Sequence, residues 1–311
     1  MKKFLQQVAI FSFIIVALIV IIECTLRRVP TIYAYKQQLV EERGEQMRNV
    51  VLGSSIVDCG IDPTCLSDSS YNLAIAGQWY RYTTAFARKN IDRMPRLRTI
   101  VFGICYHSFW CDDSMEQDMV SYVSHHIYMG IGRPHNLFAR SELLASGSAA
   151  MKKWSKYYVR RKPTMHCDSL GLDHSFDLPG KPHEWLEEIP DDVKWQTDLA
   201  CKSESEQLFG ENLNRLDDLA RLCADRGINL LFVIPPVHKD YLACTDAEQW
   251  KKVEAALATL KRNWPGVDFR NYAADPRFVD DDFYDAHHLS ADVGAGKFTR
   301  ILRDDFASLF R

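Results

Sequence analysis

Two segments far apart in the chain contain the residue types that serine chemistry requires. Gly53-Ser54-Ser55 follows a short apolar run, and Asp285-Ala286-His287-His288 lies near the C-terminus. A serine hydroxyl needs a base to take its proton, and histidine suits this role because its unperturbed pKa is ~6.5. A carboxylate beside that histidine fixes its tautomer and stabilises the imidazolium. We therefore predict Ser55 as nucleophile, His288 as base and Asp285 as its orienting partner; the three-residue spacing favours His288 over His287.

Each segment also has a plainer interpretation. Gly-Ser-Ser is a common turn or helix cap, and Asp285 could cap a helix beside two exposed histidines. The acidic run Asp280-Asp281-Asp282 could bind a cation or form a solvated loop. None of the nine cysteines forms a Cys-x-x-Cys pair or zinc spacing with histidines, so the sequence predicts no metal site and no cofactor. Beyond Cys24 the remaining cysteines could be disulfide-bonded or free thiols.

The elements expected to position these residues alternate between strands and helices. Short apolar runs bounded by turn residues predict buried strands, and stripes at helical spacing predict helices between them. This pattern is typical of an α/β three-layer sandwich with a five-stranded parallel sheet in flavodoxin-like order. Ligands bind beyond the carboxyl ends of such strands, so Ser55, just after the first predicted strand, is well placed to contact a substrate. The predicted strands are 49–53, 70–75, 99–104, 229–234 and 266–270, and the predicted helices are 79–93, 208–223, 247–264 and 291–310.

The N-terminal segment differs from the rest of the chain. Residues 4–22 form an apolar stretch of 19 residues, roughly 28 Å of helix, close to the ~30 Å hydrocarbon core. We expect 1–28 to be an uncleaved membrane anchor; a signal peptide is the alternative, but the exit lacks a small-x-small pattern. Lys2-Lys3 favour an N-terminus inside, with the main domain periplasmic or extracellular, although Arg27-Arg28 balance them.

The remaining organisation follows from these assignments. Residues 29–48 are predicted to be a helical stalk, and 49–311 an α/β domain with an insertion at about 107–203 covering the active edge of the sheet. The basic run 151–162 in that insertion could lie near membrane phosphates or form a solvated helix face. A formal net charge of −3 gives no basic field, so nucleic acid is not expected as a partner.

Taken in order, the motifs resemble the SGNH (GDSL-like) hydrolase superfamily. The similarity is to its membrane-anchored branch, with the D-alanine transfer protein of teichoic-acid modification and alginate-type O-acetylation proteins. Val51-Leu52-Gly53-Ser54-Ser55 resembles the first block and Asn72-Leu73-Ala74-Ile75-Ala76-Gly77 the second. Asp285-Ala286-His287-His288 resembles the family's closing block. The resemblance implies an oxyanion hole made by the backbone N–H groups of Ser55 and Gly77.

The third block departs from the family pattern. Its usual oxyanion-hole Asn is absent from Gly103-Ile104-Cys105-Tyr106-His107-Ser108, so Tyr106 or Ser108 would have to donate instead. The resemblance implies serine acyl transfer or ester hydrolysis on an extracytoplasmic glycan or acylated small molecule, with a multi-pass membrane acyltransferase as a partner. The absent Asn favours the alternative, a catalytically weak scaffold protein in a membrane glycan-modification complex.

Overall fold

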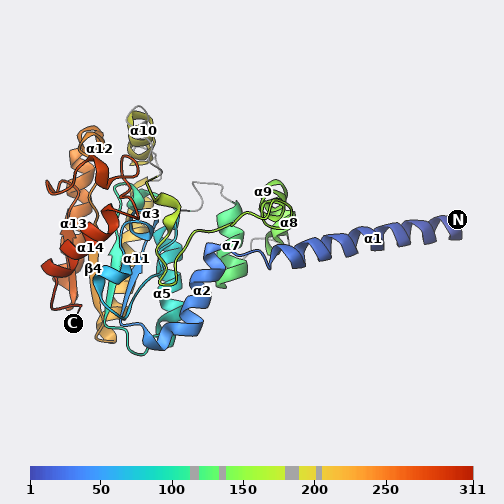
Figure 1. Ribbon diagram of the computed structural model, residues 1–311, viewed down its shortest axis with the longest axis horizontal. Coiled ribbons are helices and arrows are strands. Elements are labelled where there is room, and N and C mark those ends of the chain that lie inside the picture. The colour runs from blue at the N-terminus through green and yellow to red at the C-terminus, as the bar shows by residue number, and fades with distance from the viewer. Residues whose placement is uncertain (113–118, 133–137, 179–188, 201–204, 311) are drawn as a thin grey trace. The chain divides into compact units, whose positions relative to one another are not determined.

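A computed structural model describes residues 1–112, 119–132, 138–178, 189–200 and 205–310 of the chain. The chain divides into two compact units (Figure 1). The first contains Met1–Tyr35 and Asp118–Met165, and the second contains Lys36–Gln117 and His166–Arg311. Each unit is described separately below.

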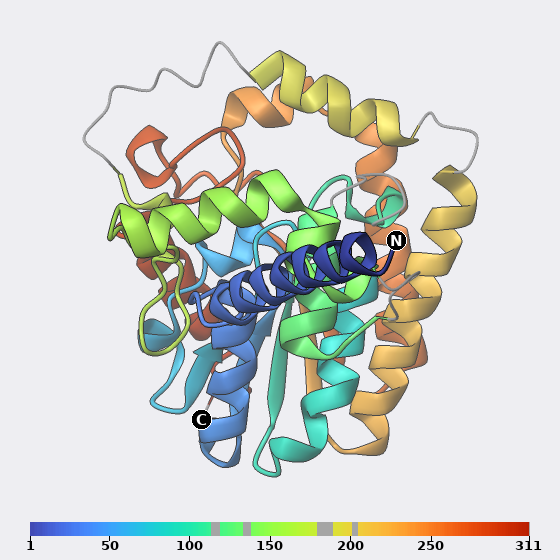
Figure 2. The same cartoon turned by 90° about the vertical axis from the view of Figure 1, so that its right-hand side faces the viewer.

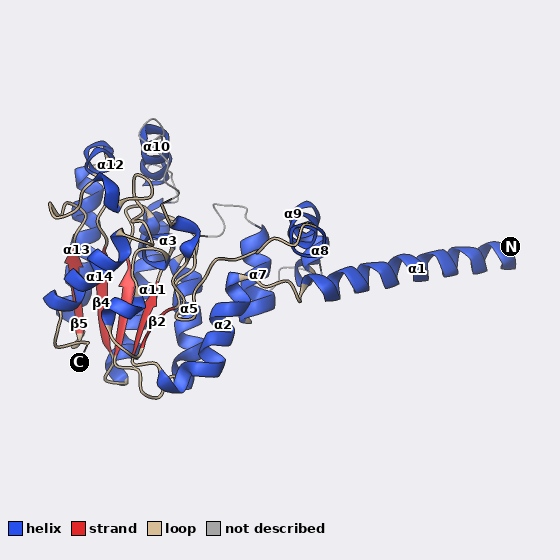
Figure 3. Ribbon diagram, in the orientation of Figure 1, coloured by secondary structure: helices blue, strands red, loops and turns tan. Residues whose placement is uncertain are grey.

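The second unit is built on a five-stranded sheet in which every neighbouring pair is parallel (Figure 3). The strand order is β2-β1-β3-β4-β5, so the predicted α/β fold and flavodoxin-like order are confirmed. The strands are β1 (Asn49–Leu52), β2 (Ser70–Asn72), β3 (Thr99–Gly103), β4 (Asn229–Ile234) and β5 (Val267–Asn271).

Helices cover the sheet on both sides because alternate strand residues are apolar on each face. Val51, Val101 and Leu231 stand in register and pack with Phe298 and Leu302 of the C-terminal helix. The next residues in register face the other way, where Phe102 contacts both Tyr80 and Phe232. Burial on both faces explains why these strands read as continuous apolar runs.

The helices of this unit connect successive strands. Helix α5 (Tyr80–Asn90) follows β2, α11 (Ser205–Asp225) follows β3, and α13 (Ala247–Asn263) follows β4. Both α5 and α13 contact α11, and the short helix α4 contacts the C-terminal helix α14. The predicted N-cap of α13 is confirmed, since the Asp246 side chain accepts hydrogen bonds from the N–H groups of Glu248 and Gln249. The helices are α2 (Ile32–Arg43), α3 (Ser55–Asp58), α4 (Pro63–Leu66), α5 (Tyr80–Asn90), α10 (Ile189–Ala200), α11 (Ser205–Asp225), α12 (Lys239–Cys244), α13 (Ala247–Asn263) and α14 (Gly294–Asp305).

The segment expected as a stalk contains α2, which begins at the end of the first unit. From Lys36 onward its side chains belong to the second unit, where Lys36, Leu39 and Val40 are buried. The helix expected there is present, and its residues from Lys36 onward are packed into the second unit. The polar composition concealed this because Lys36 is buried through an ion pair, described below.

The first unit contains the long helix α1 (Lys2–Leu26) and the middle of the predicted insertion. Helix α1 is the one described helix that is long and apolar enough to cross a membrane. The accompanying helices are α7 (Met119–Met129), α8 (Glu142–Ala145) and α9 (Gly147–Trp154), and α9 continues as a π-helix over Ser155–Val159. Figure 2 shows the same ribbon turned by 90°, viewed from the N-terminal side of α1.

Candidate active site

Ser55 lies at the carboxyl end of β1, as the first residue of the short helix α3. Gly53 ends the strand with φ +142°, a conformation that L side chains rarely adopt. A Cβ on Gly53 would lie 2.8 Å from Cγ2 of Val57, so glycine also allows α3 to pack tightly against the strand. Because Ser55 opens the helix, its backbone N–H has no partner within that helix. The local sequence therefore presents a hydroxyl and a backbone donor at the same turn.

His288 joins Ser55 to Asp285 through hydrogen bonds on both of its ring nitrogens. Nε2 of His288 lies 2.7 Å from Oγ of Ser55. Nδ1 of the same ring lies 2.9 Å from Oδ1 and 2.8 Å from Oδ2 of Asp285. This is the arrangement in which a carboxylate holds the proton on Nδ1 and leaves Nε2 to accept the serine proton. The structure thus brings together the three residues that the sequence predicted.

The Asp285 carboxylate is stabilised in its charged form. Burial by itself would raise its pKa, but the charge and ring hydrogen bond of His288 outweigh burial and hold the pKa well below its usual range. Its Oδ1 also accepts the backbone N–H groups of His287, at 3.0 Å, and His288, at 2.8 Å. Asp285 is consequently charged at neutral pH and fixed by its own turn.

His287 points elsewhere, although its ring centroid lies only 4.1 Å from that of His288. Its ring stacks on Tyr241 with centroids 5.3 Å apart. Burial, and then the charge of His288, lower the pKa of His287 to about 3, so its ring is neutral. The contact between His288 and Ser55 agrees with the spacing argument that favoured His288 as the base.

Donor atoms of Asp285, His287 and His288 lie within 4.8 Å of one another, which is close enough for a metal ion. However, the Asp285 oxygens already accept two backbone N–H groups and the His288 ring. Nε2 of His288 is likewise engaged by Ser55. A metal would have to displace these hydrogen bonds, so the donor set fits a triad better than a metal centre.

Acidification is expected to destabilise the second unit through its buried neutral histidines. The pKa of His287 is about 3 and that of His107 about 4, in both cases lowered chiefly by burial. Unfolded histidine binds a proton near pH 6.5, so the unfolded state takes up more protons as the pH falls from 6.5 towards 4. We expect the free energy of unfolding to decrease in this window, on the order of 2 kcal/mol per histidine.

The measurement is the melting temperature of the wild type and the His287→Gln variant between pH 7.5 and 4.5. The other titrating groups are present in both proteins, so the difference in slope reports the removal of His287. The wild type should show the steeper loss of stability. Parallel curves for the two proteins would contradict a neutral buried His287.

Gly77, predicted as an oxyanion donor, lies on a segment anchored next to Ser55. The N–H of Ile75 donates to the carbonyl of Gly53 at 3.2 Å. Gly77 has φ +70°, and a Cβ there would meet no atom within 4 Å. Open space beside a backbone amide in this conformation is what close approach of a ligand needs. The geometry is compatible with an oxyanion role for the Gly77 N–H, which remains a proposal.

A buried ion pair between Lys36 and Asp58 supports the segment that contains Gly77. Nζ of Lys36 lies 3.0 Å from Oδ1 of Asp58, and both side chains are fully buried. The Lys36 ammonium also donates to the carbonyls of Asn72, at 2.9 Å, and Gly171. Oδ2 of Asp58 accepts the N–H of Ala76 at 3.1 Å. Burial raises the pKa of Asp58 to about 6, although Lys36 acts to lower it. The pair thus holds the residue that precedes Gly77.

Replacing Lys36 with alanine is expected to lower the free energy of unfolding by about 3–5 kcal/mol, since it leaves the Asp58 carboxylate buried without its cation. Urea unfolding of the full-length protein in detergent, followed by near-ultraviolet circular dichroism, measures this loss. Lys251→Ala is the matched control, because Lys251 is 70% exposed and its replacement should leave the urea midpoint close to that of the wild type. Equal stability of the two variants would refute the role given to the ion pair.

The residues at the third block are placed differently from one another. Cys105 occupies the position of the absent Asn, and its Sγ lies 4.0 Å from Oγ of Ser54 and in contact with Oγ of Ser108. The Tyr106 hydroxyl accepts the backbone N–H of Asp246 at 2.7 Å, and its ring lies against Trp250. The Tyr106 hydroxyl therefore lies against the start of α13, and that of Ser108 against the Cys105 thiol. Their role as oxyanion donors stays a prediction.

Sequence reasoning missed one aromatic side chain beside the triad. The ring of Phe176 packs on His288 with centroids 4.9 Å apart. Phe176 comes from the predicted insertion, where irregular spacing gives no periodic signal. His107, at the start of the insertion, is buried between Trp79 and Trp195, at 5.8 and 5.3 Å, and hydrogen-bonds Gln196. Of that insertion, residues 166–178 and 189–200 belong to the second unit, whereas 118–165 belong to the first.

A small apolar pocket lies next to these residues. Its cavity volume is about 10 Å³, room for one water-sized group. Its lining comes from the carboxyl ends of β1, β3 and β4, from α13 and from the neighbour of the base; the main residues are Ile56, Cys105, Tyr106, Ile234, Trp250 and His287. A pocket of this size next to the triad can hold little more than a methyl group in the present conformation.

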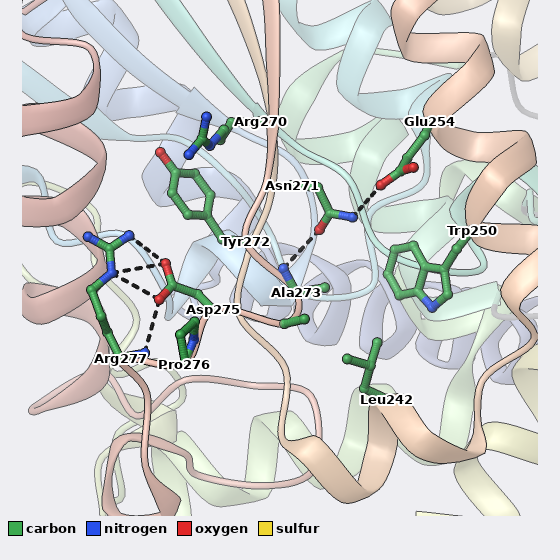
Figure 4. A pocket seen from close by; sticks show the side chains of 11 residues that line it. Leu242, Trp250, Glu254, Arg270, Asn271, Tyr272, Ala273, Asp275, Pro276 and Arg277 are labelled. Carbon is green, nitrogen blue, oxygen red and sulfur yellow. Dashed lines mark hydrogen bonds and ion pairs between the residues drawn. The ribbon is translucent and has the colours of Figure 1, made fainter.

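A larger hollow of about 680 Å³ lies at the end of β5 (Figure 4). Two pairs of its polar side chains bond to each other: Asn271 donates to Glu254 at 2.6 Å, and Arg277 pairs with Asp275. Size alone would favour this hollow as a site, but none of the triad residues is among those that line it, so we assign it no chemistry.

Cys59, Cys65 and Cys105 are free thiols. Cys201 lies outside the described residues. Of the two alternatives drawn from the sequence, these three cysteines follow the free-thiol one.

Comparison with known proteins gives distant structural likenesses alone. No protein-family model and no curated protein matches the chain. One similar solved structure, from Streptococcus pneumoniae and provisionally described as a platelet activating factor, has 12% identity, a TM-score of 0.43, and covers 97% of this chain and 99% of its own. Another, provisionally described as an acylhydrolase from Bacteroides fragilis, has 12% identity, a TM-score of 0.37, and covers 84% and 88%. These likenesses establish no family membership, so the conclusion on function depends on the residues and their geometry.

Proposed function

We propose that this protein is a membrane-anchored serine acyltransferase or esterase that acts on an extracytoplasmic glycan or similar envelope substrate. The observation that carries the proposal is the continuous hydrogen-bonded chain from Asp285 through His288 to Oγ of Ser55. Ser55 and His288, which are 233 residues apart in the sequence, meet here at 2.7 Å. A helix cap or an exposed histidine pair would not require that contact.

The chemistry follows from the arrangement. His288 takes the hydroxyl proton as Oγ of Ser55 attacks an acyl carbonyl, and the imidazolium that forms is stabilised by Asp285. The N–H groups of Ser55 and Gly77 are the proposed donors to the tetrahedral oxyanion. His288 then returns the proton to the leaving alcohol, giving an acyl-enzyme. A second hydroxyl, deprotonated by His288, resolves it: water makes the protein an esterase, and a sugar hydroxyl makes it a transferase.

The glycan substrate and the anchored location are supported by other features. The motif order resembles the membrane-anchored SGNH branch, in which surface polysaccharide is modified. The exposed apolar helix α1 is long enough to hold the protein in a membrane. A multi-pass membrane acyltransferase that supplies the acyl group fits this proposal as a partner.

One observation favours a second candidate, a catalytically weak partner protein in a glycan-modification complex. Cys105, in place of the usual Asn, has no amide to donate, and its thiol contacts Ser108. Loss of one oxyanion donor typically costs ~3 kcal/mol of transition-state stabilisation. Such a protein would keep the triad geometry yet turn over slowly.

Fluorophosphonate labelling tests the proposal, because the probe reacts with serines activated by a neighbouring base. Full-length protein in detergent should be labelled at Ser55, as located by mass spectrometry, and should release acyl groups from activated esters. Labelling without measurable turnover would favour the partner protein. A folded wild-type protein that resists the probe would contradict the proposed enzyme.

A further inference from the structure

A basic, aromatic segment of the first unit is fastened to the C-terminal end of α1. We name residues 138–162 the collar; it comprises the 3-10 turn Phe138–Arg140, α8, α9, the π-helix and the three residues Arg160-Arg161-Lys162. Figures 1 and 2 show α8 and α9 beside this end of α1. Both α1 and the collar belong to the same compact unit.

Glu23 makes the first of these connections. Its carboxylate accepts the Ser141 hydroxyl at 2.8 Å and the backbone N–H groups of Glu142 at 3.1 Å and Leu143 at 3.0 Å. These amides open α8, where a negative charge is favourable. An acidic residue directly after an apolar membrane span thus has a defined structural use, which is to cap the first helix of the collar.

Thr25 and Arg27 make the remaining connections. The Trp154 indole N–H donates to Oγ1 of Thr25 at 2.9 Å, and the Tyr158 hydroxyl donates to the carbonyl of Thr25 at 3.1 Å. Nη2 of Arg27 donates to the carbonyl of Arg140 at 2.8 Å. The collar is therefore held at the point where the apolar part of α1 gives way to polar residues.

The collar exposes apolar side chains close to every one of these hydrogen bonds. Phe138 is 63% exposed, Leu144 48%, Met151 38% and Val159 64%. Each lies within three residues of a collar residue bonded to Glu23, Thr25 or Arg27. Large apolar side chains exposed this close to the end of a membrane span match the level of the lipid headgroups and the first acyl carbons.

The charge of the collar differs in sign from that of the chain. It contains seven basic residues and one acidic residue, a net charge of 7 − 1 = +6, whereas the whole chain has −3. The acidic residue, Glu142, is itself buried against Lys153 and accepts the Tyr128 hydroxyl at 2.7 Å. Arg160, Arg161 and Lys162 are exposed. Basic side chains at this level attract anionic lipid phosphates, and tryptophan and tyrosine are favoured there.

We propose that the collar binds the outer surface of the bilayer that holds α1, inserting Phe138, Leu144, Met151 and Val159 among the lipid headgroups and directing its basic residues to phosphates. This inference depends on the proposed membrane anchoring by α1. It adds a second, interfacial attachment that the anchor alone does not imply. Of the two interpretations of the basic run, it selects contact with membrane phosphates over a solvated helix face.

Photocrosslinking in vesicles tests the collar. Full-length protein is reconstituted into phosphatidylcholine vesicles containing phosphatidylglycerol and a phospholipid with a photoreactive acyl chain, and crosslinked peptides are identified by mass spectrometry. We expect crosslinks on α1 and on collar peptides, with α13 of the second unit remaining at background. If α1 is crosslinked but the collar peptides give no higher crosslinking yield than α13, the collar proposal alone is overturned. Absence of crosslinks on α1 would overturn the membrane anchoring and the collar with it.

A triple variant tests the charge contribution. Replacing Arg160, Arg161 and Lys162 with glutamine should lower the collar crosslinking yield in anionic vesicles, since each basic residue near an anionic surface shifts the equilibrium about fivefold. The α1 yield should stay constant and serves as the internal standard. The matched control replaces Lys239, Lys251 and Arg262, exposed basic residues of the second unit, with glutamine. Equal collar yields in the two triple variants would refute the electrostatic part of the proposal.

Discussion

Replacing Ser55 with alanine is expected to lower the rate of ester cleavage by about 10⁴–10⁶-fold, the range seen when the nucleophile of a serine triad is removed. The physical reason is that Oγ of Ser55 is the hydroxyl within reach of Nε2 of His288, at 2.7 Å. The neighbouring Ser54 hydroxyl lies 4.0 Å from the Cys105 thiol instead. Without Oγ no acyl-enzyme forms, and fluorophosphonate labelling should disappear with turnover.

Ser54→Ala is the matched control for this experiment. It removes the same group one residue earlier and should retain most of the labelling and turnover. Both variants should keep the wild-type melting temperature to within a few degrees, because neither removes apolar packing. Labelling that survives in Ser55→Ala, or that disappears equally in Ser54→Ala, would show that Ser55 is not the nucleophile.

Replacing Asp285 with asparagine is expected to lower kcat by about 10⁴-fold with little loss of folding. The amide oxygen can still accept the backbone N–H groups of His287 and His288, so the turn survives. The amide nitrogen, however, would donate to Nδ1 of His288 and move the ring proton to Nε2. A protonated Nε2 donates to Oγ of Ser55 and can no longer take its proton.

His287→Gln separates the two adjacent histidines in the same assay. Its ring stacks on Tyr241, so its loss should change kcat/KM less than about tenfold, whereas His288→Ala should match Ser55→Ala within an order of magnitude. Steady-state kinetics on an activated ester, with the melting temperature of each variant, provide the readout. Asp285→Asn retaining more than a tenth of wild-type kcat, or His287→Gln failing as severely as His288→Ala, would contradict the assignment.

The sheet could be predicted from the sequence because its strands are buried on both faces. Val51, Val101 and Leu231 pack on one side and Phe102 and Phe232 on the other, so each strand is a continuous apolar run bounded by turn residues. The positions of the triad residues followed from the same order, since strand ends in a parallel sheet meet at one edge. A contact between Ser55 and His288 could then be expected, because Ser55 follows the first strand and the three-residue spacing from Asp285 favours His288 as the base.

Other parts of the site could not be predicted because they depend on tertiary contacts without a local pattern. Lys36 lies in a polar segment whose composition gives no sign of burial, yet it is buried in an ion pair with Asp58, 22 residues later. Phe176 lies in an irregular segment whose composition does not indicate contact with His288. The phenol of Tyr106 suggests a hydrogen-bond donor, whereas in the structure its hydroxyl accepts the backbone N–H of Asp246, 140 residues away. In each case the partner is distant in sequence.

The turn from Asp285 to His288 has a consequence for how such a site can fail. Because Asp285 accepts the His288 ring and two backbone amides of its own turn, base and orienting carboxylate form a self-contained module of four residues. Its contact with Ser55 instead joins residues 233 positions apart. Thermal fluctuations that open the edge of the sheet therefore break the long-range contact while the local pair persists. Inactivation of the site can therefore begin with separation of Ser55 from an intact Asp285–His288 pair. Recovery then requires only the contact between Ser55 and His288 to re-form.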